Sequence, residues 1–102
     1  MSAISNKAIS DYLGGKGIPH SQVAYRYLML ALRAMVDGKV DRYHAQSVYD
    51  YVARNVGVRP EQIDRAIRYA IRKTETPVMN KEFLARALND LLLAADENSS
   101  VF

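Results

Sequence analysis

Apolar residues recur along most of the chain at the three- and four-residue spacing of helices that bury one face. No segment shows a convincing two-residue alternation, which is the pattern of a half-buried strand. We therefore expect an all-α fold, a compact five-helix domain. The helices are predicted over residues 5–13, after Pro19 to 36, 42–55, 60–73 and 81–95.

Turn-forming and capping residues separate the predicted helices. The run Gly14–Gly17 ends the first helix, and Gly38 with the preceding aspartate ends the second. Ser21 and Asn80 are residue types that cap helix N-termini, so we expect them to begin the second and fifth helices. The 102 residues form a single domain, whose ends, 1–4 and 96–102, are expected to be loose.

The second predicted helix is apolar around most of its circumference, which is typical of a helix at the centre of a bundle. Nearly half of the chain is apolar, so a domain of this size can bury a core without a metal or a disulfide. The apolar positions of this helix are Val23, Tyr27, Leu28, Leu30, Ala31, Ala34 and Met35.

The third and fourth predicted helices are separated by residues 56–59, which is the length of the turn in a helix-turn-helix. Gly57 can take the positive φ that such a turn needs. Ala53 is small where the two helices would cross, and Val58 and Ile63 are apolar where the turn would meet the core. The spacing predicts a helix-turn-helix from about Tyr49 to Lys73, and the alternative is a plain helical hairpin with a glycine turn.

Charge is concentrated on the same segment. Six cations and two anions lie between Arg54 and Lys73, a net charge of +4, whereas the whole chain carries +3. Such a basic focus is typical of a face that binds phosphates, although a solvated helix face would also be charged.

The exposed face of the fourth predicted helix carries side chains suited to a recognition helix. Gln62 and Arg65 lie near its start, where they can read base edges, since Gln pairs with adenine and Arg with guanine. Asp64 could accept from a cytosine amino group or offset local repulsion. The residues expected to contact phosphates, which set register, are Arg54, Arg59, Arg68, Tyr69, Arg72 and Lys73.

Other classes of function find little support in the sequence. The chain has no cysteine, its only histidines are His20 and His44, and Gly14–Gly17 lacks the spacing of a phosphate-binding loop. We therefore expect no catalysis, no cofactor and no metal site. No signal peptide is visible, and the apolar stretch 27–32 is too short to span a bilayer, so we expect a cytoplasmic protein without a membrane partner.

A protein-interaction module remains the main alternative. Several tyrosines could form an exposed patch together with Leu92 and Leu93, and a partner or a second copy would then be expected. A weak dimer would also suit two half-sites on DNA. The tyrosines are Tyr12, Tyr25, Tyr27, Tyr43, Tyr49, Tyr51 and Tyr69.

Three sequence blocks resemble a known family, the C-terminal DNA-binding (effector) domain of the sporulation master response regulator (Spo-zero-A). The most specific block is Ile-Asp-Arg-Ala-Ile-Arg-Tyr-Ala-Ile at 63–71, where the family has Val-Glu-Arg-Ala-Ile-Arg-His-Ala-Ile. The resemblance implies an all-α bacterial transcription regulator that binds double-stranded DNA at a box related to TGTCGAA. The same block also includes Tyr49-x-x-Val52-Ala53, which precedes residues 63–71. The other two blocks are Gly17-Ile18-Pro19 with Tyr25-x-Tyr27-Leu28, and Asn80-x-Glu82-Phe83-Leu84-Ala85 with Leu91.

The resemblance also shows where this sequence departs from the family. Arg65 matches a base-reading Arg, Asp64 is a shortened form of the family Glu, and Gln62 replaces an Arg, so another box is expected. Tyr69 replaces a phosphate-contacting His. We expect no phosphoacceptor receiver domain, so the chain is either an excised fragment or a stand-alone regulator. The family's extra helix before the last one is missing, which counts against contact with RNA polymerase and makes repression conceivable.

Overall fold

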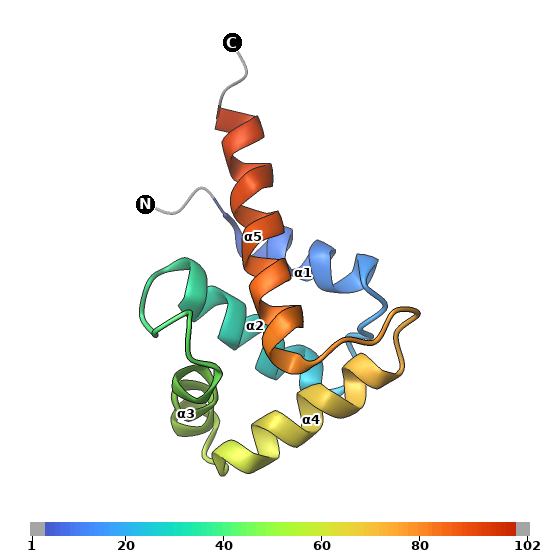
Figure 1. Ribbon diagram of the computed structural model, residues 1–102, viewed down its shortest axis with the longest axis vertical. Coiled ribbons are helices and arrows are strands. Elements are labelled where there is room, and N and C mark those ends of the chain that lie inside the picture. The colour runs from blue at the N-terminus through green and yellow to red at the C-terminus, as the bar shows by residue number, and fades with distance from the viewer. Residues whose placement is uncertain (1–3, 100–102) are drawn as a thin grey trace.

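The computed structural model describes residues 4–99, which form five helices and no strand (Figure 1). This confirms the predicted all-α fold. The helices are α1 (Asn6–Gly15), α2 (Val23–Val36), α3 (Ala45–Val56), α4 (Pro60–Arg72) and α5 (Asn80–Ser99).

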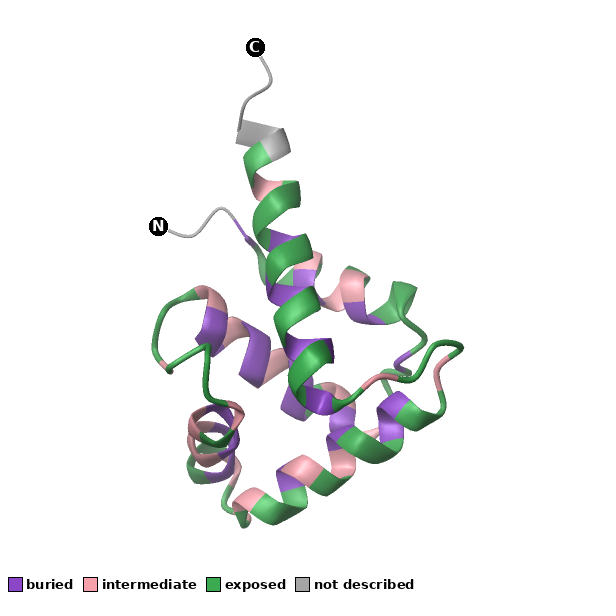
Figure 2. Ribbon diagram, viewed as in Figure 1, coloured by how far each residue is buried: buried purple, intermediate pink, exposed green. Residues whose placement is uncertain are grey.

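Helix α2 lies at the centre of the molecule and contacts all four other helices. Figure 2 shows buried residues on the faces of α2, α4 and α5 that turn toward one another. The central position predicted from its apolar circumference is confirmed, except that Val23 in its first turn is 58% exposed. The buried residues of α2 are Ala24, Tyr27, Leu28, Ala31, Leu32, Ala34 and Met35.

Two helix starts differ from the prediction. Helix α2 is preceded by Gln22 rather than Ser21 as its N-cap, and the Gln22 side chain makes no capping hydrogen bond. Helix α3 starts at Ala45 rather than at residue 42. The reason lies in Asp41, whose carboxylate accepts a hydrogen bond from the backbone N–H of Tyr43 and pairs with the His44 ring. That local turn competes with the helix and delays its first residue.

The described parts of the ends that were expected to be loose have defined contacts or helical backbone. Ile4 is only 5% exposed, and its carbonyl oxygen accepts a hydrogen bond from Arg33 at 2.9 Å. Helix α5 continues to Ser99 instead of ending at residue 95, since Ala94 and Ala95 favour helical backbone. Residues 1–3 and 100–102 lie outside the described residues.

Candidate nucleic-acid interface

Three residues, Gly57–Arg59, join α3 to α4 and set their relative direction. Gly57 has a φ of 76°, as the turn prediction required. The backbone N–H groups of Gly57 and Val58 both donate to the carbonyl oxygen of Ala53, at 2.8 and 3.2 Å. The turn therefore ends α3 with two N–H groups on the carbonyl oxygen of Ala53, in place of the regular helical bonds that would continue the helix.

The two helices are not arranged as an antiparallel hairpin. In Figure 1, α3 is seen nearly along its axis while α4 runs across the view, so the two axes are far from parallel. Ala53 on α3 and Ile63 on α4 are both buried, and Val58 of the turn packs against the core. These three positions have the small and apolar roles that the sequence suggested.

Helix α4 divides sharply into a buried and an exposed face. Ile63, Ile67, Ala70 and Ile71 are at most 2% exposed and hold the helix on the core. Because one turn takes 3.6 residues, the residues on the opposite side of the helix point outward. The exposed residues of this outward face are Glu61, Gln62, Arg65, Arg68, Tyr69 and Arg72.

The three residues predicted to read bases lie in different surroundings. The side chain of Arg65 is exposed and makes no hydrogen bond or ion pair within residues 4–99. The side-chain oxygen of Gln62 accepts from the backbone N–H of Arg59 at 3.1 Å, which caps the start of α4 and leaves the Gln62 NH₂ group available. Asp64 is only half-exposed and is held by two neighbouring side chains.

Asp64 belongs to a polar junction between α4 and α5. Its carboxylate accepts from Arg68 at 2.7 Å and from the Nδ2 of Asn80 at 2.8 Å. Asn80 is 7% exposed and is the first residue of α5, where its side chain binds α4 instead of capping its own helix as expected. Burial raises the pKa of the neighbouring Tyr49; the nearby Asp64 acts in the same direction and Asn80 against it. The sequence suggested a cap at Asn80 but gave no sign of this junction.

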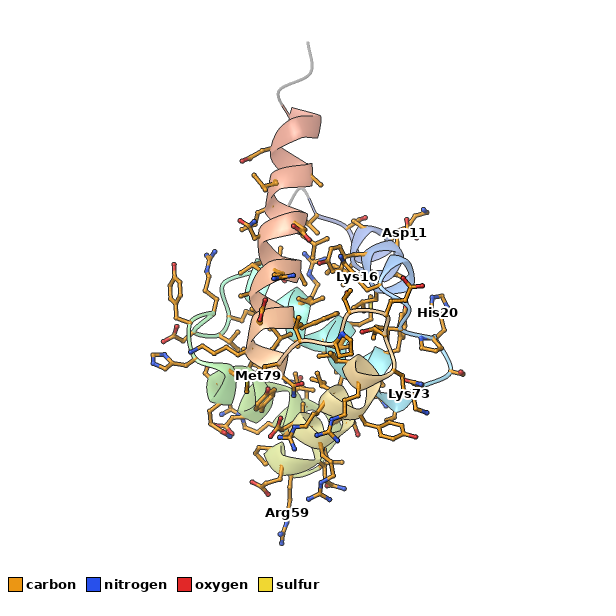
Figure 3. The ribbon with its side chains drawn as sticks, turned by 45° about the vertical axis from the view of Figure 1, so that its right-hand side comes forward. Asp11, Lys16, His20, Arg59, Lys73 and Met79 are labelled. Carbon is orange, nitrogen blue, oxygen red and sulfur yellow. The ribbon has the colours of Figure 1, made fainter. Side chains whose placement is uncertain are left out.

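The predicted phosphate-contacting residues are all exposed and are spread along and around α4. Arg54 lies near the end of α3, and Arg59 precedes α4. In Figure 3, Arg59 and Lys73 lie at opposite ends of α4. The Nζ atom of Lys73 lies 4.3 Å from the centre of the Tyr69 ring, so these two side chains are held together.

The tyrosines do not gather into one exposed patch. Only Tyr43 and Tyr69 are largely exposed, and they lie in the α2–α3 loop and on α4. Leu92 and Leu93, which are 38% and 54% exposed, lie in the C-terminal half of α5. Most tyrosines are buried or half-buried.

Residues 4–99 bring together no group of three or more side chains of the kinds that hold metals. None of the helices described there has both the length and the apolar content that crossing a bilayer requires.

Comparison with known proteins adds no relative, because no protein-family model, no curated protein and no solved structure matches the chain.

Proposed function

We propose that this protein binds double-stranded DNA sequence-specifically and regulates transcription in the bacterial cytoplasm, with α4 in the major groove. The observation that carries the proposal is the outward face of α4, where Gln62, Arg65 and Arg72 stand exposed on a helix anchored by its other face. A helix of about 10–12 Å diameter fits the major groove, which is about 12 Å wide.

Each exposed side chain has a role in this proposal. Arg65, which has no partner among the described residues, is free to pair with a guanine, and the Gln62 NH₂ group can donate to a base acceptor. Asp64 orients Arg68 and anchors α5, so base contact by Asp64 itself would require these bonds to open. The proposed phosphate contacts are Arg54, Arg59, Arg68, Tyr69, Arg72 and Lys73.

The resemblance to the sporulation regulator's effector domain supports the same proposal through residues 63–71, which coincide with the anchored and outward faces of α4. Leu92 and Leu93 could let two copies meet on adjacent half-sites. They also support the competing hypothesis, a protein-interaction module, because both are exposed large apolar side chains on α5.

Titration of labelled duplexes tests the proposal. One duplex carries the family-like box and a second carries a scrambled box. A pool of random-sequence duplexes is used for selection, and every titration is made at two salt concentrations. Tighter binding to one sequence at both salt concentrations is expected. Failure to bind any duplex at low salt would overturn DNA binding and favour the interaction module.

A further inference from the structure

A cleft of about 440 Å³ opens where the end of α1 meets the connection between α4 and α5. This volume lies within the range of small-molecule sites. Its walls come from three separate parts of the chain, and Figure 3 shows Lys16 and Lys73 on the same side of the molecule. The residues that matter for its chemistry are Tyr12, Lys16, Lys73, Thr76, Phe83 and Arg86.

The lining of the cleft combines aromatic rings with positive charge. Three of its residues are cations, whereas Glu75 is the one carboxylate among those lining it. Arg86 pairs with Glu82, and Lys16 lies 5.5 Å from the centre of the Tyr12 ring, with no ion pair in the described structure. Cations beside aromatic walls suit a ligand that has both an anionic group and a flat ring.

Two glycines in the wall of the cleft have no structural requirement of their own. Gly14 and Gly15 end α1 with negative φ, and a Cβ added at either would meet nothing within 4 Å. Glycine weakens a helix relative to alanine, so neither backbone nor packing explains the pair. Their missing side chains leave the backbone at the cleft open to close approach by a ligand.

The ends of α1 and α4 also meet the cleft, and helix C-termini disfavour anions. Several carbonyls at these ends are already engaged: the Lys16 N–H donates to Tyr12 and Leu13, and the Thr74 N–H donates to Ile71. Lys16 and Lys73 add full positive charges at these same ends. The residues that line the cleft therefore carry a net positive charge, with Glu82 on Arg86 and Asp90 on the Tyr12 hydroxyl as neighbouring carboxylates.

We propose that this cleft binds a nucleotide-like molecule, in which a phosphate group is joined to an aromatic ring. The phosphate lies between Lys16, Lys73 and Arg86, and the ring lies against the wall formed by Tyr12 and Phe83. The site shares Lys73, the C-cap of α4, with the proposed phosphate contacts and otherwise lies apart from the outward face of that helix. The proposal does not depend on DNA binding.

Amide NMR of the full chain tests the proposal, with ADP, pyrophosphate and adenosine added as separate probes. ADP should shift the amides of Gly14, Gly15, Gly17 and Thr76 saturably and bind more tightly than either part alone. The variant Lys16→Gln should weaken ADP binding about fivefold, as expected for loss of one exposed charge contact. The matched control Lys39→Gln, in the α2–α3 loop, should leave it unchanged.

A second variant tests the cleft without changing its charge. Gly15→Ala has room for its Cβ, so it should fold and still lower the affinity for ADP. Absence of saturable shifts with every probe, or equal binding by Lys16→Gln and the original chain, would overturn the proposal. Shifts confined to Arg65 and Arg72 would also overturn it, because they would show attraction of phosphate to α4 alone. Binding of DNA duplexes is measured separately, so a failure of the cleft proposal can be told apart from a failure of the proposed DNA binding.

Discussion

The Nδ2 atom of Asn80 donates to the backbone oxygen of Asp64 at 3.0 Å and to its carboxylate at 2.8 Å. Asn80 is the first residue of α5, and Asp64 lies in the second turn of α4. One buried amide thus fixes the start of α5 on α4, and the same carboxylate holds Arg68 in place.

Replacing Asn80 should destabilise the fold. Asn80→Ala removes two hydrogen bonds and leaves half-buried acceptors on Asp64, which costs about 1–3 kcal/mol of unfolding free energy. The lower part of this range is expected, because the Asn80 Oδ1 has no hydrogen-bond partner among the described residues and its loss costs little. Urea denaturation measures the change, and Asn89→Ala, exposed on the same helix, should change stability by less than about 0.5 kcal/mol. Equal effects of both variants would contradict the structural role of Asn80.

The helices could be predicted from the sequence because apolar spacing is a local property. Each of the five appears where its apolar stripe lies, and Gly57 takes the positive φ that its position between two helices required. The start of α3 was predicted three residues too early. Its sequence before Ala45 carries no strong helix breaker, and the turn depends on side-chain contacts of Asp41.

The surroundings of Asp64 could not be predicted in this way. Its partner Asn80 is 16 residues away in sequence, and the contact exists only because α5 packs against α4. The local pattern could identify Asp64 as polar and outward but not as half-buried. The same holds for the cleft: Gly14–Gly17 was predicted only as the end of the first helix, which continues to Gly15, while the approach of this run to residues 73–76 depends on tertiary packing.

Two glycine variants should change stability in opposite directions. Gly57→Ala places a Cβ at a φ of 76° and should lower stability by about 1 kcal/mol, although no neighbouring atom is in its way. Gly14→Ala lies in helical backbone with open space around it and should raise stability by about 0.4–1 kcal/mol. Thermal unfolding of the two variants gives the comparison. A rise in Tm for Gly57→Ala would show that the turn can relax out of its left-handed conformation.

The loop before α3 should make stability depend on pH. Hydrogen bonds from the Tyr43 backbone and the His44 ring lower the pKa of Asp41 below its ordinary value of 3.8. A carboxylate with a lowered folded-state pKa stabilises the fold above 3.8, and that contribution is lost as the pH falls through the lowered pKa. Asp41→Asn should therefore lower Tm at about pH 6 and have a smaller effect at about pH 2.5.

Thermal unfolding at both pH values checks the Asp41 prediction. Glu75→Gln is a suitable control, because Glu75 is exposed and makes no hydrogen bond or ion pair within the described residues. Its effect on Tm should be small and similar at both pH values. An Asp41→Asn variant whose Tm deficit does not shrink in acid would show that the carboxylate charge contributes nothing to this turn.

In the proposed complex with DNA, Arg72 contacts a backbone phosphate. Arg72→Ala should weaken binding to all duplexes by a similar factor, because phosphates are the same in every sequence. The slope of log affinity against log salt should fall by about one unit, as one phosphate contact is lost. Lys7→Ala is the matched control, since Lys7 is an exposed cation on α1, which packs against α2 and α5. An unchanged salt slope in Arg72→Ala would remove this residue from the interface.

Arg65 should act differently from Arg72, because it lies closer to the start of α4, where base edges come within reach. Arg65→Ala should reduce the preference for the selected sequence over its single-base variants by about 1–3 kcal/mol at one base pair. Folding should be unaffected, since the side chain is exposed and makes no bond within residues 4–99. Competition titrations with the set of variant duplexes measure this preference. If Arg65→Ala and Arg72→Ala both weaken every duplex equally, α4 contacts only the backbone and the sequence is read by another part of the chain.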